Sequence, residues 1–213
     1  MSQTLLVASE IANMLLQAEA IKLSPSKPFK WSSGWNSPIY CDNRVTLSFP
    51  TFRTYIKESL AAKIKAEFPN VAAIAGVATA GIPQGALVAD LLGLPFIYVR
   101  PKAKEHGMGN QIEGKVTPGQ KVVLVEDLIS TGGSSLKAAE ALIAQDIEVL
   151  GMVAIFTYGF GVADENFAQA GIQLHCLSNY DEMLTVAVAS GYIKASDLDS
   201  LAQWRKNPSI WGV

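Results

Sequence analysis

The most informative segment of the sequence is Val122-Val123-Leu124-Val125-Glu126-Asp127-Leu128-Ile129-Ser130-Thr131-Gly132-Gly133-Ser134. Its four leading residues are all apolar, as expected of a central parallel strand that is buried on both faces. Two acids follow at once, and adjacent carboxylates do not enter a core without partners. A turn of small residues then leads into a helical pattern. The stretch therefore predicts a strand that ends at Val125 and delivers two acids onto a phosphate-binding turn.

The turn from Ser130 to Ser135 has the composition of a phosphate site. Its glycines allow backbone N–H groups to converge, its hydroxyls donate further hydrogen bonds, and the helix that follows adds a favourable field. The plainer alternative is a surface turn that caps a helix. Two other nucleotide motifs are excluded, because the stretch from Gly76 to Gly81 lacks the dinucleotide glycine spacing and is not followed by the Lys-Ser or Lys-Thr of a P-loop.

Strand and helix patterns alternate outward from this stretch. Apolar runs predict strands at 71–75, 95–99, 121–125, 148–156 and 172–177. Helical periodicity appears at 5–21, 50–68, 81–92, 134–145, 181–189 and 196–206. This alternation favours parallel β-α-β units, so we predict an α/β fold with a single domain over 1–213. Residues 1 to about 45, with short strands over 29–41, are expected to form a cap on the sheet.

Composition sets the broad class. The chain has 213 residues, 49% hydrophobic and 17% charged, with a net charge of −2. These values are ordinary for a globular enzyme, and binding to nucleic acid would need a basic face that is missing. The two cysteines, Cys41 and Cys176, are expected to be free thiols, and they form no zinc motif with the two histidines. The N-terminus does not resemble a signal peptide and no apolar run reaches roughly 18 residues, so we expect a cytoplasmic protein without membrane spans.

Two acids beside a phosphate turn suit a ribose 5-phosphate. The turn would hold the 5′-phosphate, and carboxylates accept hydrogen bonds from the vicinal ring hydroxyls. Carboxylates also stabilise the positive charge that develops on the sugar when the bond at C1 breaks. The sequence therefore indicates chemistry at C1 of a phosphorylated ribose.

At these residues the sequence resembles the type I phosphoribosyltransferases, whose signature is four hydrophobic residues, two acids and a small-residue turn. Within that family it is most similar to the orotate phosphoribosyltransferases, over nearly the whole chain. The resemblance extends to four further segments, 29–40, 76–83, 100–107 and 110–114. It implies the type I phosphoribosyltransferase fold, in which a central, mostly parallel sheet is flanked by helices and carries a small N-terminal cap, or hood.

The resemblance also implies an activity. This is the Mg²⁺-dependent transfer of the 5-phosphoribosyl group from 5-phosphoribosyl 1-diphosphate (PRPP) to orotate, which gives orotidine 5′-phosphate and diphosphate on the route to UMP. The implied assembly is a homodimer with shared active sites. The metal would be held mainly by PRPP and water, with no protein ligand assigned. Neither nucleic acid nor membrane is an implied partner.

Carried over by position, the resemblance implies catalytic roles for Glu126, Asp127, Lys104 and His106. The implied PRPP contacts are Arg100, Lys104, His106, Glu126, Asp127, Leu128, Ile129, Ser130, Thr131, Gly132, Gly133 and Ser134, with Ser130 also near orotate. Lys104 and His106 lie in the glycine-containing segment 102–114, which is either a solvated loop or a lid that closes over the leaving diphosphate and excludes water.

Aromatic residues gather in the predicted cap. Trp31, Trp35 and Tyr40 usually indicate packing, although a flat pyrimidine also needs a stacking surface and the amides of residues 32–34 could supply hydrogen bonds. His175 is interpreted as structural, and Trp204 as part of the core or an interface. Two alternative functions stay open at this point. One is transfer to a different base, a purine or uracil, and the other is a PRPP-sensing regulator without catalysis.

The role given to the acid pair leads to a prediction. The Asp127→Asn variant, which replaces the carboxylate with an amide, should have a strongly reduced kcat but a free energy of unfolding close to that of the wild type. The reason is that the side chain is assigned to the substrate and not to the core. Steady-state kinetics and urea unfolding of the same preparation measure both quantities. Near-normal turnover in this variant would contradict the assigned role.

Overall fold

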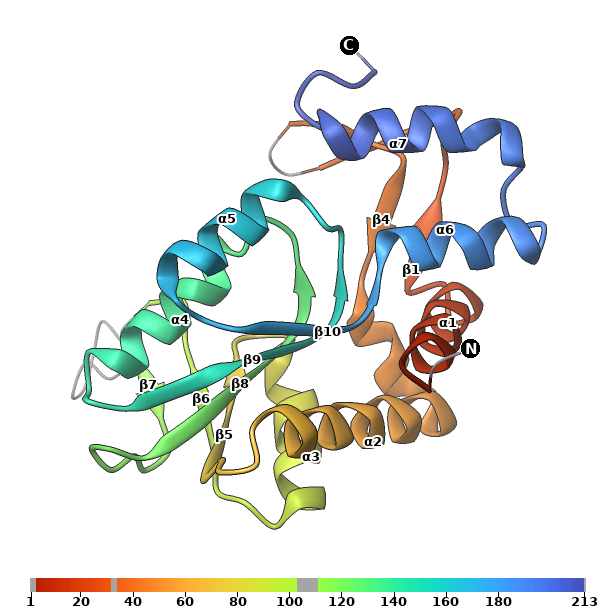
Figure 1. Ribbon diagram of the computed structural model, residues 1–213. Helices are drawn as coiled ribbons and strands as arrows, with labels where there is room; N and C mark the ends of the chain where they lie inside the picture. Colours follow the sequence, from red (N-terminus) through yellow and green to blue (C-terminus); the bar gives the residue numbers. More distant parts are fainter. Residues whose placement is uncertain (1–2, 32–33, 103–110, 213) are drawn as a thin grey trace.

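The centre of the molecule is a six-stranded sheet in the order β10-β9-β8-β5-β6-β7 (Figure 1). The computed structural model describes residues 3–31, 34–102 and 111–212. The strands are β5 (Ala73–Val77), β6 (Phe96–Val99), β7 (Ile112–Glu113), β8 (Lys121–Ile129), β9 (Glu148–Thr157) and β10 (Leu174–Asn179). All neighbours are parallel except β7, which pairs antiparallel with β6. The predicted mostly parallel sheet is therefore confirmed.

The order in which the strands are added to the sheet changes direction between the parallel neighbours β5 and β8. From β5 the chain proceeds to β6 and β7 on one side, and from β8 it proceeds to β9 and β10 on the other. Open α/β sheets bind ligands outside the carboxyl ends of the strands at such a switch point. The topology therefore directs attention to the carboxyl ends of β5 and β8.

Strand β8 is longer than the sequence predicts. It pairs with β5 only as far as Gly76 opposite Val125, but it pairs with β9 as far as Ile129 opposite Thr157. The predicted end at Val125 is thus wrong, because the ladder with β9 continues through both acids. Glu126 and Asp127 lie within a strand that runs past one of its two neighbours.

Helices cover both faces of the sheet (Figure 1). The helices α2 (Pro50–Glu67) and α3 (Gly81–Leu92) pack on one face, and α4 (Gly133–Ile143) and α5 (Gly161–Ala170) on the other. Successive residues of a strand point to opposite faces. Val123 and Val125 accordingly join the core of α2 and α3, whereas Val122 and Leu124 join that of α4 and α5.

The N-terminal segment packs together with the end of the chain. It contains α1 (Gln3–Gln17), β1 (Ile21–Leu23), β2 (Phe29–Lys30), β3 (Asn36–Ser37), β4 (Ile39–Cys41) and the 3-10 helix η1 (Asn43–Ser48). The final helices are α6 (Tyr180–Ala189), η2 (Ala195–Asp197) and α7 (Leu198–Lys206), and Figure 1 shows α7 beside the N-terminal strands. Trp204 of α7 is 0% exposed and meets the ring of Trp31 edge to face at 5.6 Å.

The two ends of the chain show one difference from the sequence prediction and one agreement with it. Helix α1 ends at Gln17 and not at residue 21, because Glu19 has a left-handed φ of 53° and the backbone then enters β1. Trp204 belongs to the core, which confirms one of its two predicted roles. No helix in the described part of the chain is both long and apolar enough to cross a membrane.

The turn between β5 and α3 fits tightly against β8. A Cβ added at Gly81 would lie 2.3 Å from the carbonyl oxygen of Val125. We expect Gly81→Ala to lower the free energy of unfolding by about 1–3 kcal/mol, because backbone has to move to admit the methyl group. Gly161→Ala is the matched control, since its Cβ would meet no atom within 4 Å. Urea unfolding that gives equal stabilities for the two variants would contradict the tight fit.

Candidate active site

Glu126 is turned into the protein. Its side chain is 6% exposed, and both carboxylate oxygens accept hydrogen bonds. The Ser135 hydroxyl donates to Oε2 at 3.0 Å, and the backbone N–H of Asp127 donates to Oε1 at 2.9 Å. Ser135 itself is 2% exposed, at the start of α4. Glu126 is therefore held in place by β8 and α4, while Asp127 is only partly buried.

Burial perturbs the titration of both acids. It raises the pKa of Glu126 well above the usual range, and the charge of Asp127 raises it further. Burial also raises the pKa of Asp127, although a hydrogen bond from Glu126 and the positive charge of Arg44 act in the opposite direction. Two desolvated carboxyls that share a site favour a partner with hydroxyl donors or positive charge.

The turn after β8 presents the N-terminus of α4. Gly132 has a left-handed φ of 80°, and a Cβ there would lie 2.7 Å from Cε2 of Phe167, so only glycine fits without rearrangement. The amide of Asn166 donates to the Thr131 carbonyl at 2.9 Å and fixes the turn from outside. Among the residues that the structure describes, no side chain caps α4, so its first N–H groups are available to an anion.

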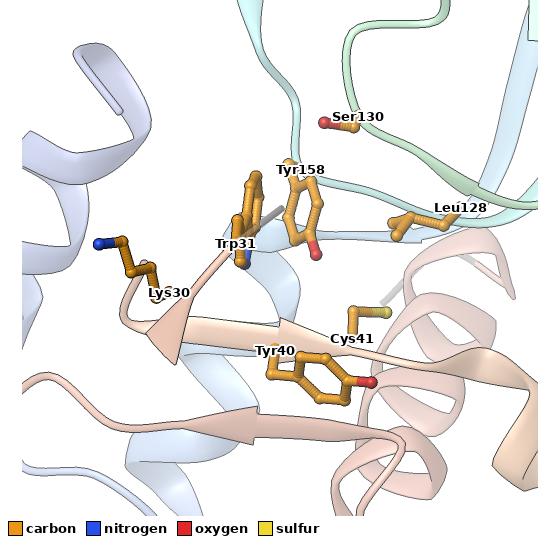
Figure 2. Close-up of a pocket in the computed structure, with 7 residues that line it drawn as sticks. All are labelled: Lys30, Trp31, Tyr40, Cys41, Leu128, Ser130 and Tyr158. Carbon is orange, nitrogen blue, oxygen red and sulfur yellow. The ribbon is translucent and has the colours of Figure 1, made fainter. Parts of the chain in front are cut away.

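A cavity of about 430 Å³ lies beside this turn. Its lining comes from the N-terminal segment, from the end of β8 and from the residue after β9, namely Lys30, Trp31, Tyr40, Cys41, Leu128, Ser130 and Tyr158 (Figure 2). Trp31 and Tyr158 pack at 5.3 Å, and the Trp31 indole N–H donates to the Ile39 carbonyl. Figure 2 shows the Tyr158 hydroxyl on the side of Cys41 and Tyr40, while the amino group of Lys30 points away from the other residues.

A second cavity, of about 300 Å³, is lined in part by Ser134, at the end of the turn. Its polar lining consists of Arg100, Lys102, Gln111, Ser134 and Lys137. Arg100 Nη1 lies 3.7 Å from Oε1 of Glu113, and it is buried without a hydrogen-bond acceptor among the described residues. The cavity therefore gathers three cationic side chains next to the last residue of the phosphate turn.

The structure distributes the predicted site residues that it describes among two cavities, the turn and the protein interior. Leu128 and Ser130 reach the first cavity, and Arg100 and Ser134 reach the second. Arg100, two residues before the predicted lid segment 102–114, and Gln111, within that segment, exchange two hydrogen bonds of 2.9 and 3.0 Å. Lys104 and His106 lie outside the described residues, as do positions 32 and 33 of the predicted cap.

Several residues at the site were missed in the sequence. Tyr158 follows β9, so the rule that ligands lie at the carboxyl ends of parallel strands could have found it. Ser135 lies nine residues after Glu126, at the start of α4, and the sequence assigned its hydroxyl to the phosphate turn and not to the acid. Cys41 and Asn43 carried no such signal, because their contacts depend on how the N-terminal segment folds back onto β8.

Comparisons with known proteins agree with this geometry. A family model described as a phosphoribosyl transferase domain matches residues 55–168. The orotate phosphoribosyltransferase of Cytophaga hutchinsonii is 62% identical over 202 residues, which cover 95% of this chain and 97% of that protein. The chain belongs to the phosphoribosyltransferase family.

Further relatives place the chain in the orotate phosphoribosyltransferase branch of that family. The orotate phosphoribosyltransferase of Listeria monocytogenes serotype 4b is 54% identical over 206 residues, covering 97% of this chain and 99% of that protein. The crystal structure of the enzyme from Aeropyrum pernix superimposes with a TM-score of 0.75 at 30% identity, over 86% of this chain and 99% of that one. These matches confirm the predicted fold class.

Part of Leishmania donovani UMP synthase, a longer protein, has the same fold. It matches with a TM-score of 0.77 and 25% identity, and the match covers 92% of this chain but 42% of that enzyme. The phosphoribosyltransferase domain of this chain thus corresponds to one part of a larger chain there.

The buried acid of this phosphoribosyltransferase allows a stability test. Burial favours the protonated form of Glu126, whose pKa in the folded protein is raised above its ordinary value of 4.5. The contribution of this carboxyl to the free energy of unfolding is therefore fully present below pH 4.5. It is lost as the pH rises through the pKa of the folded state, because the carboxyl then has to become charged in the interior. Glu126→Gln avoids this loss and can keep both hydrogen bonds. We expect the free energy of unfolding of the variant to be higher than that of the wild type, and the difference to grow between about pH 5 and about pH 8. The turnover of the variant should be lower than that of the wild type.

Urea unfolding at the two pH values measures the difference. Glu140→Gln, at an exposed position of α4, is the control and should show no growing gap. A stability difference between Glu126→Gln and wild type that stays constant with pH would contradict the account.

Proposed function

We propose that this protein is an orotate phosphoribosyltransferase that transfers the 5-phosphoribosyl group of PRPP to N1 of orotate, on the route to UMP. One observation carries the proposal. The aromatic cavity and the phosphate turn share Ser130, and Leu128 of the signature strand forms part of the cavity wall. A base held in the cavity would thus lie next to a sugar phosphate held on the turn. The identity of the curated relatives supports orotate as the base.

The acid pair and the turn are proposed to hold the sugar phosphate. The uncapped N-terminus of α4 and residues Ser130, Thr131, Gly132, Gly133 and Ser134 would bind the 5′-phosphate. Asp127 would accept hydrogen bonds from the ribose hydroxyls, with Glu126 behind it. Because Glu126 already accepts two hydrogen bonds within the protein, we assign it chiefly to the alignment of Asp127.

The first cavity is proposed to hold the base. Its volume lies within the range of small-molecule sites. Trp31, Tyr40 and Tyr158 provide flat apolar surface, and the hydroxyls of Tyr158 and Ser130 provide hydrogen bonds that a pyrimidine dione needs. Residues 1 to about 45 would then act as the cap over the base, braced by α6 and α7.

The second cavity is proposed to lie on the diphosphate side. Arg100 reaches it from β6 and suits phosphate oxygens because its guanidinium offers several donors in a fixed plane. Lys104 and His106 are proposed to join it from the lid and to stabilise the leaving diphosphate. The proposed assembly is a homodimer in which part of this cationic set serves the neighbouring subunit.

The residues present also fit Mg²⁺ held mainly by substrate. Mg²⁺ in such sites keeps several waters and binds one or two carboxylates plus substrate phosphates. The described residues contain no cluster of three His, Cys, Asp or Glu side chains that could enclose a metal. With both Glu126 oxygens engaged, Asp127 is the acid of the pair better placed to contact the hydrated ion. The ion would neutralise charge on the diphosphate.

The proposed reaction is a displacement at C1 of the ribose. The C1–O bond to diphosphate breaks and its electron pair leaves with diphosphate; N1 of orotate then forms the new bond to C1 and loses its proton to water. The sugar carries positive charge between these events, and the carboxylate of Asp127 would stabilise that charge. No general base is assigned.

The test is a direct assay of the full chain with PRPP and Mg²⁺. Orotate absorbance should fall only when protein, PRPP and Mg²⁺ are all present. Adenine, hypoxanthine, guanine and uracil, supplied one at a time, are the controls. Turnover of one of these bases in place of orotate would favour transfer to that base, and PRPP binding without turnover of any base would favour a PRPP-sensing regulator.

A further inference from the structure

Asn43 joins the N-terminal segment to the acid pair. It lies in η1, directly after β4, and is 1% exposed. Its side-chain amide donates from Nδ2 to the backbone carbonyl of Asp127 at 2.7 Å. Its other side-chain atom, Oδ1, accepts from the thiol of Cys41 at 3.3 Å. One buried side chain therefore contacts both a wall of the base cavity and the strand that carries the acids.

The hydrogen bond from Asn43 to the Asp127 carbonyl lies beyond the point where β8 stops pairing with β5. Strand β5 accompanies β8 only as far as Val125, so β8 has lost that neighbour two residues before Asp127. A buried carbonyl needs a hydrogen-bond donor. The amide of Asn43 supplies the donor from a segment that is 84 residues away in sequence. Only an amide side chain combines this donor with an acceptor for Cys41 in one short planar group.

The turn that presents Asn43 is itself fixed. The Thr46 hydroxyl donates to the backbone carbonyl of Asn43 at 2.6 Å, and Thr46 is fully buried. The carboxylate of Asp42 accepts from the backbone N–H of Arg44 and forms two further bonds with its guanidinium, of 2.7 and 2.9 Å. These hydrogen bonds hold the backbone of Asn43 in one position, so its side chain holds the N-terminal segment at a fixed position relative to β8.

We propose that Asn43 is a positioning residue, which sets the base cavity at the correct distance and angle from the sugar site. The proposal rests on the proposed function and concerns a residue outside the signature stretch. Transfer requires N1 of the base to be held close to C1 of the sugar, and small misplacements lower the rate strongly. A ligand that contacts the sugar site alone should not depend on this alignment, whereas one that spans both regions should.

The experiment compares two unreactive ligands in the full-length protein. Ribose 5-phosphate contacts the sugar site alone, and orotidine 5′-phosphate without diphosphate spans the sugar site and the base cavity. Asn43→Ser removes the amide while leaving a small polar side chain. We expect it to weaken orotidine 5′-phosphate binding and lower kcat by about 10-fold each, with ribose 5-phosphate affinity changed by less than about 2-fold. Isothermal titration calorimetry gives both dissociation constants.

Two further variants separate positioning from loss of stability. Thr46→Val removes a hydrogen bond in the same turn but leaves the amide bond to Asp127, so it should lower the melting temperature and keep the wild-type ratio of the two dissociation constants. Asn43→Asp keeps the shape and places an acceptor against the carbonyl, so it should shift the ratio as Asn43→Ser does. Only folded molecules bind either ligand. A partly unfolded preparation therefore still gives the ratio of the dissociation constants for ribose 5-phosphate and orotidine 5′-phosphate.

Two results would overturn the proposal. One is a wild-type ratio of the two dissociation constants in both Asn43 variants. The other is a shift in Thr46→Val as large as that in Asn43→Ser, which would attribute the effect to general loosening of η1. Failure of the proposed function is distinguishable, because it would appear in the wild-type protein as absence of orotate turnover.

Discussion

Two adjacent carboxyls lie where β8 runs past β5, and the surrounding structure is arranged to hold them there. Desolvated acids are costly unless their oxygens are paired. Ser135 and a backbone N–H pair Glu126, and the long ladder with β9 keeps the strand straight through both acids. The cost that remains falls on both acids, since burial raises the pKa of each, and Asp127 is the more exposed of the two. Binding of hydroxyls and cations would relieve that cost, which is why the pair is suited to a charged sugar transition state.

The base side of the site depends on the two ends of the chain. The N-terminal strands carry Trp31 and Tyr40, but Trp204 of α7 is buried against Trp31 and Tyr158. Ser9 of α1 also hydrogen-bonds Glu182 of α6. The cap is therefore supported by segments at opposite ends of the sequence, and Asn43 connects it to the acid strand. The proposed sugar site and the proposed base cavity share Ser130, which lines the cavity and begins the turn.

The central strand and the mostly parallel sheet could be predicted from the sequence, but the full length of β8 and the contacts of the N-terminal segment could not. The apolar run Val122–Val125, the two acids and the glycine turn indicated a central strand and a phosphate site without any structure. The strand end was placed too early, since its length depends on β9. Asn43 resembles any polar loop residue in sequence, because its importance arises from a bond to a strand 84 residues away. The choice of orotate came from resemblance and not from the physics of any residue.

A crystal structure with orotidine 5′-phosphate bound tests most directly whether the acid strand and the cap form one site. We predict the pyrimidine in the cavity beside Tyr158, the phosphate on the turn from Ser130 to Ser134, and the ribose hydroxyls at about 2.7–3.2 Å from the carboxylate of Asp127. A nucleotide that binds with its base outside this cavity, or with its ribose away from Asp127, would contradict the account.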